Sequence, residues 1–359
     1  MISLRLKSEC DPSLAPFVVR IANEVSQDTS DAQLIMEEPN LLGFQSVCGD
    51  FHLHNVAPAD VAGDVLLVDP RRQIAHRLIR AASQHNTFLI TEQCDQLCVM
   101  CSQPPKPHHE DMFAHFLAAA RLAPLGARIG LSGGEPLLHK KQLFEFIETS
   151  LTDRDDLTFH ILTNGQHFER DDLPWLRAHR SKLLWGIPIY SEIPSVHDDL
   201  VGKSGAFDKL SNSLSLMGLA GAAIELRTVV MTQNVAGLAG LADFISRHIP
   251  FATTWAIMQM ERIGYGRMNW DRCFFDSSAD FNELGTAIDL IQARNQDVTL
   301  YNFPLCTVPP AYRRYAARSI SDWKQKYLPA CAECQLRSDC TGFFEWYRED
   351  SGFTEIRPQ

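Results

Sequence analysis

Three cysteines stand close together in the run TEQCDQLCVMCSQPP, at positions Cys94, Cys98 and Cys101. Thiolates are the ligands of iron–sulfur clusters, and three of them from one short loop can bind three irons of a cubane 4Fe–4S cluster. The fourth iron then has no protein ligand, so it can bind a small molecule and pass it an electron. In structural metal sites the protein usually supplies all four ligands, so a set of three favours a catalytic site over a structural one. The alternative is that these cysteines form part of a zinc site.

The sequence around this loop predicts two strands and a helix. Residues 86–93 (NTFLITEQ) are rich in β-branched and apolar side chains, which is typical of a strand. Asp111 can cap a helix that runs to about residue 121, and a second strand follows at ARIGL, residues 127–131. Glycines allow a ligand to approach the backbone closely, and a glutamate offers an acceptor for an ammonium group. Both occur in the tetrad directly after this strand, which consists of Gly133, Gly134, Glu135 and Pro136.

A strand, a Cys-x3-Cys-x2-Cys loop, a helix, a strand and this tetrad, in that order, resemble the radical S-adenosylmethionine superfamily. The resemblance extends from about residue 86 to about residue 269, and more weakly to residue 344. It implies a 4Fe–4S cluster on the three cysteines, with S-adenosylmethionine chelating the open iron through its amine and carboxylate. It also implies reductive cleavage of this cofactor to a 5′-deoxyadenosyl radical, which takes a hydrogen atom from the substrate.

The resemblance further implies a cofactor pocket. Met100 stands where the family often has an aromatic residue against the adenine, and methionine can also lie against a ring face. Arg227 would meet the cofactor carboxylate, and the alternative is an ion pair within its mostly apolar strand. Ser191 would bind the ribose hydroxyls, and the alternative is a turn or helix cap. The full expected set is Met100, Gly133, Gly134, Glu135, Pro136, Asn164, Ser191, Arg227 and Asn234.

The middle of the chain alternates between apolar strands and amphipathic helices. Six βα units are expected, which predicts an α/β fold, a partial (β/α)6 TIM-like barrel of the radical S-adenosylmethionine type. In such barrels the chemistry lies at the carboxyl ends of the strands. The residues expected at these ends are Cys94, Gly133, Asn164, Ser191, Asn234 and Glu261. The expected strands are residues 86–93, 127–131, 158–163, 183–190, 224–231 and 254–260.

A second set of cysteines lies near the carboxyl end of the sequence, at Cys306, Cys331, Cys334 and Cys340. Four thiolates can close a cluster completely, which favours electron transfer over substrate binding. The pattern resembles the auxiliary-cluster domain of radical enzymes that act on peptides, in its single-cluster form, and so implies a second, auxiliary 4Fe–4S cluster. The alternative is a zinc ribbon, because four cysteines also suit zinc.

Two further features have both functional and structural interpretations. Cys273 follows the sixth strand and could face the barrel mouth, where it would donate a hydrogen atom to a substrate radical as a catalytic residue; the alternative is a small buried side chain. The stretch HDDLVGKSGAFDKL, which begins at His197, resembles the corresponding loop and helix of peptide-modifying members of the superfamily. His197 and Asp198 are therefore candidate functional residues, and caps and turns are the alternative.

Composition sets outer bounds on the function. The chain has 359 residues, enough for two or three domains, and a net charge of −11, which argues against a large phosphate-binding face and hence against nucleic acid. We expect no membrane span and no signal peptide, and hence a cytoplasmic protein. In a reducing compartment, ten cysteines favour metal or redox chemistry over disulfides. Three domains are expected, with residues 1–85 as a candidate for binding a peptide or a partner, 86–270 forming the barrel and 271–359 carrying the auxiliary cluster.

The run HNTFLITEQCDQLCVMCSQPPK and the tail YNFPLC…SISDWK…CAEC…CTGFF resemble the C-component maturases of the His-Xaa-Ser peptide systems. This resemblance implies a ribosomally made precursor peptide as substrate, a second radical maturase as partner and an external electron donor. Three alternatives stay open at this point. They are a radical S-adenosylmethionine enzyme acting on a small molecule, a non-catalytic iron–sulfur electron carrier and a zinc-stabilised interaction protein.

Overall fold

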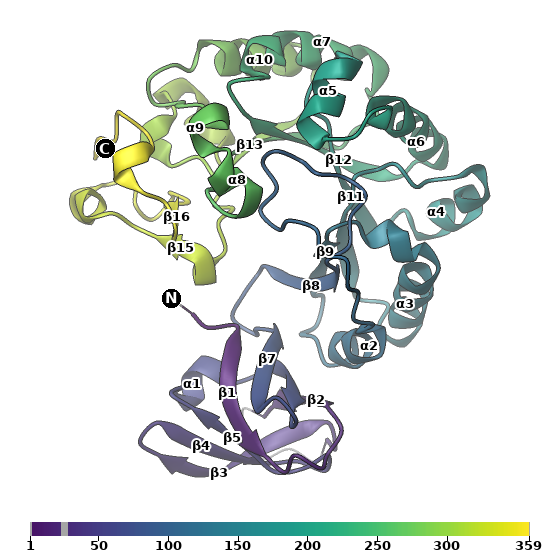
Figure 1. The fold of residues 1–359 in the computed structure, drawn as a ribbon, viewed down its shortest axis with the longest axis vertical. Helices are drawn as coiled ribbons and strands as arrows, with labels where there is room; N and C mark the ends of the chain where they lie inside the picture. Colours follow the sequence, from purple (N-terminus) through teal and green to yellow (C-terminus); the bar gives the residue numbers. More distant parts are fainter. Residues whose placement is uncertain (1, 23–27, 359) are drawn as a thin grey trace.

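A computed structural model describes residues 2–22 and 28–358 of the chain. Figure 1 shows three parts: a small β-barrel at the amino-terminal end, a large sheet flanked by an arc of helices, and a carboxyl-terminal region with little regular structure. Met1, residues 23–27 and Gln359 lie outside the described residues. Among the residues that are described, no helix is long and apolar enough to cross a membrane.

The amino-terminal barrel is closed and follows the strand order β1-β5-β4-β3-β2-β6-β7. Every second side chain points inward, as the period of a strand requires, and the interior holds Val19, Phe44, Phe51 and Leu53. Strands β6 and β7 pair antiparallel and form a hairpin around Pro70. The elements are β1 (Arg5–Cys10), β2 (Phe17–Ile21), β3 (Asp31–Glu38), β4 (Leu41–Gln45), β5 (Phe51–His54), α1 (Pro58–Val61), β6 (Val65–Asp69) and β7 (Ile74–Ile79).

The large sheet is parallel throughout, and its seven strands lie side by side in chain order. The sequence predicted six of them at nearly these positions, and the count of six was wrong. The missed strand, β14, has only four residues, too few for a clear periodicity, and its pairing with β13 identifies it. The strands are β8 (Asn86–Thr91), β9 (Arg128–Gly133), β10 (Thr158–Leu162), β11 (Leu183–Pro188), β12 (Ala223–Val230), β13 (Thr254–Gln259) and β14 (Val298–Tyr301).

Helices cover one face of this sheet and form the outer arc in Figure 1. Strand β12 shows how the two faces differ. Its Ile224, Leu226 and Val230 are fully buried in the main core, whereas Glu225 and Arg227, in the alternate positions, form an ion pair on the opposite face. The helices are α2 (Phe113–Arg121), α3 (Lys140–Asp153), α4 (Leu173–His179), α5 (Pro194–Val201), α6 (Ala206–Ala220), α7 (Leu238–His248) and α10 (Asn282–Ala293), with 3-10 turns at Pro136–His139, Arg170–Asp172 and Val235–Gly237.

The carboxyl-terminal region is built from short 3-10 turns and a two-stranded sheet, β15 (Gln325–Lys326) with β16 (Phe343–Phe344). Leu328, Phe343, Tyr347 and Phe353 form its small core. Two short helices, α8 (Gly264–Met268) and α9 (Trp270–Cys273), follow the sixth strand, and the indole N–H of Trp270 donates to the carbonyl of Ser351 in this region, at 2.5 Å. The large sheet continues to Tyr301, beyond residue 270, where the sequence placed the end of the barrel. The 3-10 turns are Leu305–Thr307, Pro310–Tyr315, Asp322–Lys324, Pro329–Glu333 and Glu349–Ser351.

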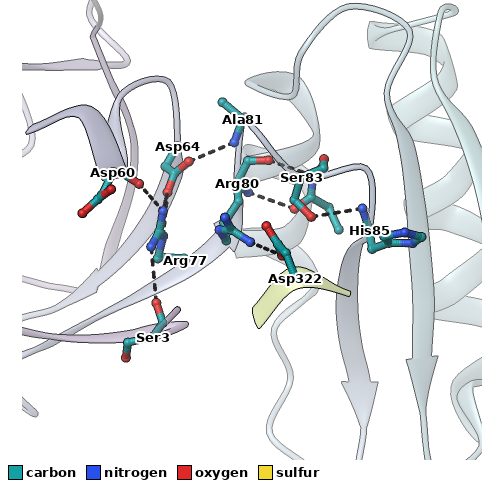
Figure 2. A network of polar contacts seen from close by, with 10 residues as sticks. Ser3, Asp60, Asp64, Arg77, Arg80, Ala81, Ser83, His85 and Asp322 are labelled. Atoms are coloured by element: carbon teal, nitrogen blue, oxygen red, sulfur yellow. Dashed lines mark hydrogen bonds and ion pairs between the residues drawn. The ribbon is translucent and has the colours of Figure 1, made fainter. Parts of the chain in front are cut away.

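A polar network connects the barrel, the linker that follows β7 and the carboxyl-terminal region (Figure 2). The buried pair Arg77 and Asp64 joins β7 to the turn before β6, and Asp64 also accepts the backbone N–H of Ala81, at 2.9 Å. Arg80, whose side chain is largely buried, donates to Asp322 in the carboxyl-terminal region, at 2.6 Å. Residues 242 positions apart in sequence therefore meet at the linker.

Candidate active site

The three cysteines lie on the loop that leaves β8 at the carboxyl end of the sheet. A turn brings them together, since the backbone N–H of Cys101 donates to the carbonyl of Cys98, at 3.0 Å. Burial, together with the neighbouring Glu135 and Cys101, raises the pKa of Cys94 to about 11. Burial also raises the pKa of Cys98, which Cys101 and Cys94 raise further. The thiols are thus mutual neighbours that stay protonated at neutral pH unless a metal displaces their protons.

This donor set fits an iron–sulfur cluster in its chemistry. Soft, partly enclosed thiols that lie within electrostatic reach of one another are the ligands such clusters take. Within residues 2–22 and 28–358 there is no group of three or more His, Cys, Asp or Glu side chains spaced to hold a single metal ion. A cubane takes one thiolate per iron, so its ligands surround four metal atoms instead of one.

The tetrad packs directly against the end of β8, next to the cysteine loop. The N–H groups of Gly134 and Glu135 donate to the carbonyls of Thr91 and Gln93, at 2.8 and 2.7 Å. A Cβ atom at Gly133 would lie 2.1 Å from the Thr91 oxygen, and one at Gly134 would lie 2.1 Å from the Gln93 oxygen. The positions that side chains would take are thus filled by the backbone at and just after the end of β8. Close approach of a ligand to these glycines stays a prediction.

Glu135 lies at the centre of this contact and is completely buried. Its carboxylate accepts hydrogen bonds from the N–H of Leu137 at 2.8 Å, the hydroxyl of Thr163 at 2.7 Å and the N–H of Asn164 at 2.5 Å. Burial raises its pKa, and these hydrogen bonds oppose the rise. Glu135 ties the tetrad to the end of β10, so an ammonium group would have to share an acceptor that already serves the protein.

A second carboxylate, Asp95, lies next to the first cysteine and was not identified from the sequence. It accepts hydrogen bonds from Asn164, at 2.7 Å, and from Lys203, and it lies 3.3 Å from His167. Burial alone would raise the pKa of Asp95, but His167 and Lys203 outweigh burial and hold it well below its usual value. The only available signal was the position of an acid inside the cysteine loop. Asn164 thus lies beside the cysteine loop.

Arg227 is paired in the structure. Its guanidinium contacts the carboxylate of Glu225, and its charged end lies 5.9 Å from the centre of the Tyr301 ring. Tyr301 donates to the same carboxylate at 3.1 Å, and His160 lies 3.4 Å from it. Although burial opposes this, His160 and Arg227 lower the pKa of Glu225 to about 2. The ion pair left open by the sequence is therefore present.

Other expected site residues have structural partners. The Ser191 hydroxyl accepts the N–H of Ile193, at 3.1 Å, in the turn before α5. Asn234 is buried and bonds to the backbones of Met231, Tyr190 and Val229, which joins the ends of β11 and β12. These contacts are the cap and tie that strand ends require.

Met100 and Cys273 belong to one apolar cluster under the cysteine loop, together with Met260 and Trp270. Cys273 is fully buried, and its sulfur accepts a hydrogen bond from Gln233, at 3.3 Å. Helix α9 places this thiol in the cluster, as expected for the small buried side chain that the sequence left as the alternative. A role as hydrogen-atom donor stays a prediction.

The stretch from His197 forms the end of α5 and the start of α6. His197 is buried, and burial lowers its pKa to about 4, while its ring accepts the N–H of Tyr190 at 3.3 Å. Asp198 accepts the N–H groups of Gly205 and Phe207, at 2.5 and 2.8 Å, and so fixes the turn into α6. Both residues have the cap and turn roles that the sequence left open.

The second cysteine set gathers around one pocket. Cys306, Cys331, Cys334 and Cys340 all line it, with Tyr327 beside them. Burial, together with the other three cysteines, raises the pKa of Cys306 to about 12. The sulfur of Cys340 accepts two backbone N–H groups, each at 3.3 Å. Four thiols on one largely apolar pocket fit the donor set of a closed cluster.

Comparison with known proteins places this geometry in context. No protein-family model matches the chain. In Bacillus subtilis (strain 168), the antilisterial bacteriocin subtilosin biosynthesis protein AlbA is 23% identical over 157 residues, which are 42% of this chain and 34% of AlbA. Streptococcus suis SuiB bound to S-adenosylmethionine superposes with a TM-score of 0.50 at 13% identity, over 60% of this chain and 49% of SuiB. The chain has the fold of radical S-adenosylmethionine enzymes.

A second SuiB structure, bound to the precursor peptide SuiA, matches this radical S-adenosylmethionine fold equally well. The TM-score is again 0.50, at 13% identity, and the match covers 62% of this chain and 49% of SuiB. The chain therefore spans about a third of AlbA and about half of SuiB. At this level of identity the likeness to SuiB concerns the fold, so activity and substrate are matters for proposal.

Proposed function

We propose that this chain is a radical S-adenosylmethionine enzyme that modifies a ribosomally made peptide. The observation that carries the proposal is the position of Cys94, Cys98 and Cys101. These thiols are neighbours on one loop at the carboxyl end of a parallel sheet, where α/β barrels place their chemistry. When bound, the cluster and its cofactor supply a 5′-deoxyadenosyl radical that takes a hydrogen atom from an unactivated carbon.

The residues of the chain would hold these groups and exclude water. Cys94, Cys98 and Cys101 would bind the 4Fe–4S cluster. The S-adenosylmethionine pocket would be formed around Met100, the tetrad Gly133–Pro136 and the strand ends at Asn164, Ser191 and Asn234, with the carboxylate directed toward Arg227. Because Glu135 and Arg227 already have protein partners, each would have to share its charge with the cofactor. The curved sheet would act as a partial barrel, with seven strands instead of six.

We propose a second 4Fe–4S cluster in the pocket formed by Cys306, Cys331, Cys334 and Cys340. This cluster would accept electrons from an external donor and pass them on. With two cubanes, reconstituted protein should contain about eight irons per chain. About four irons and one zinc would instead support a zinc ribbon.

A peptide substrate is supported by two relatives. AlbA is a bacteriocin biosynthesis protein, and SuiB has been seen with its precursor peptide. From the sequence resemblance we propose a His-Xaa-Ser precursor peptide and a second radical maturase as partners, and a cytoplasmic location. The amino-terminal domain, residues 1–85, would bind the peptide or the partner maturase.

Anaerobic reconstitution with iron and sulfide, followed by S-adenosylmethionine and dithionite, tests the activity. The protein should release 5′-deoxyadenosine. Replacing Cys94, Cys98 and Cys101 with alanine should abolish this release while the iron of the second set remains. Cys48→Ala, which removes an exposed thiol of the amino-terminal barrel, should leave release unchanged. Full cofactor cleavage by the triple variant would contradict the assignment.

Coexpression with a His-Xaa-Ser precursor and the partner maturase tests the substrate. A change in the mass or fragmentation of the peptide, lost in the triple variant, is the expected result. If the peptide stays unmodified while the same preparation turns over a small metabolite, the result would instead support a radical S-adenosylmethionine enzyme that acts on a small molecule.

A further inference from the structure

The last turn of α5 lies directly on the cysteine loop. The backbone N–H of Leu97 donates to the carbonyl of Val201, at 3.0 Å, and the N–H of Val99 donates to the carbonyl of Leu200, at 2.9 Å. These two donors flank Cys98. The residues that the sequence singled out as HDDLVGKSG therefore provide backbone acceptors for the loop that carries the three thiols.

Gly202 makes this contact sterically possible. Its φ angle is +65°, and a Cβ atom here would lie 2.8 Å from the carbonyl oxygen of Leu97. A side chain would therefore both strain the helix end and push it off the loop. Gly205, three residues later, has a similar φ angle of +71° but nothing within 4 Å of its Cβ position. An alanine at either position would strain the backbone, but only an alanine at Gly202 would also collide with the cysteine loop.

Lys203 adds a charge to this contact. Its ammonium group pairs with Asp95, which directly follows the first cysteine, and Asn164 and His167 surround the same carboxylate. The side chains of Lys203 and Asp95 are only 22% and 26% exposed. Charges at such a half-enclosed site are screened less by solvent than charges on an open surface.

We propose that residues Leu200–Lys203 form a clamp that holds the cysteine loop in place, and that the pair Lys203–Asp95 sets the charge felt by a cluster on that loop. These are positioning residues that act through the cysteines. The inference about charge rests on the proposed function, because it needs a cluster at Cys94, Cys98 and Cys101. The inference about the clamp concerns the protein alone.

Amide hydrogen exchange on the metal-free protein tests the clamp. Gly202→Ala should speed exchange at the Leu97 and Val99 amides at least tenfold, because their acceptors move away, whereas Gly205→Ala should leave both protected. Equal protection in wild type and Gly202→Ala would overturn the clamp, as would equal loss in both variants. If Gly202→Ala does not fold, Leu200→Gly, which loosens the same turn without the clash, takes its place with the same two outcomes.

The reduction potential of the reconstituted cluster, followed by electron paramagnetic resonance, tests the charge. Lys203→Met leaves Asp95 uncompensated and should make the cluster harder to reduce, by about tenfold in the equilibrium, or 59 mV for one electron. Asp95→Asn should shift the potential in the opposite direction, and the double variant should return close to wild type. If Lys203 and Asp95 had only a structural role, the two single variants would shift the reduction potential in the same direction or would not shift it.

Lys106→Met is the matched control, because Lys106 pairs with Glu92 beside the same loop but is 63% exposed. Its potential should equal that of wild type. If Lys203→Met and Asp95→Asn shift the reduction potential no more than Lys106→Met does, the proposed role of Lys203 and Asp95 is overturned. A wild-type protein that binds no iron would instead contradict the proposed function, while the exchange experiment would still decide the clamp.

Discussion

At the scale of single residues, the buried carboxylates of this site differ in what surrounds them. Glu135 is enclosed among neutral donors, namely two backbone N–H groups and one hydroxyl, and burial raises its pKa. Glu225 lies beside Arg227 and His160, which lower its pKa to about 2 despite burial. A neutral environment thus opposes ionisation of one carboxylate, and a cationic one stabilises the other as an anion.

Replacing Glu135 with alanine should destabilise the metal-free protein by roughly 3 kcal/mol, because three buried donors lose their acceptor. Urea unfolding measures this loss. Glu145→Ala, at an exposed position of α3 in the same part of the molecule, should change stability by less than about 0.5 kcal/mol. A Glu135→Ala protein as stable as wild type would show that the buried hydrogen bonds do not hold the tetrad.

Glu225 should make a pH-dependent contribution to stability. Its pKa is about 2 in the folded protein against 4.5 in the unfolded chain, so the contribution is present above pH 4.5. It should be lost progressively as the pH falls from about 4.5 to about 2. The full amount is roughly 3 kcal/mol, at 1.36 kcal/mol per pKa unit. Urea unfolding across this pH range should show that the free energy of unfolding falls less in Glu225→Gln than in wild type as the pH is lowered. An equal pH dependence in the two proteins would refute this contribution.

At the scale of elements, β8 and β9 position the site through backbone contact. The tetrad begins at Gly133, the last paired residue of β9, and its next two N–H groups donate to Thr91, at the end of β8, and to Gln93, in the turn after it. The cysteine loop begins at that same turn. Any change in the spacing of these two strand ends therefore moves the loop relative to the tetrad.

Gly134→Ala should destabilise the protein by about 2–4 kcal/mol, because the new Cβ would lie 2.1 Å from the Gln93 carbonyl oxygen, which cannot move freely. It should also lower the iron content after reconstitution. Gly130→Ala, on the same strand, is the control, since its Cβ meets the end of the Thr87 side chain instead of backbone. Differential scanning calorimetry and iron analysis measure both effects, and equal losses in the two variants would argue against a special role for the tetrad backbone.

At the scale of the whole molecule, the linker after β7 joins three parts of the chain (Figure 2). Arg80 is largely buried and pairs with Asp322, while Lys324, two residues further, lies 3.6 Å from Glu261 beyond the end of β13. One short 3-10 turn of the carboxyl-terminal region therefore contacts both the linker of the amino-terminal barrel and the end of the large sheet.

Asp322→Asn should loosen this junction and make the linker at residues 80–85 accessible to protease. The loss of stability should be moderate, about 1 kcal/mol, because Asp322 is 44% exposed and solvent screens the pair. Limited proteolysis with mass spectrometry would locate the new cut. Asp350→Asn removes a local exposed ion pair with Arg348 and should leave the cleavage pattern unchanged. Identical patterns in all three proteins would argue against coupling through the linker.

The sequence by itself determined the features that depend on neighbours along the chain. Six of the seven parallel strands, the cysteine loop after the first of them and the tetrad after the second follow from short-range periodicity and from residue types at fixed spacing. The second cysteine set was also readable as a set. Its four members meet on one pocket, although a spacing of 25 residues between the first two could not itself require this.

The tertiary structure decided everything that depends on partners distant in sequence. It assigned β14 to the sheet through pairing, filled the space above Gly133 and Gly134 with another strand, and paired Arg227 with Glu225. It also brought Lys203 to Asp95, 108 positions away, and Arg80 to Asp322. Such contacts arise when strands and helices with their own periodicity pack together, and packing of distant surfaces leaves no local pattern in a sequence.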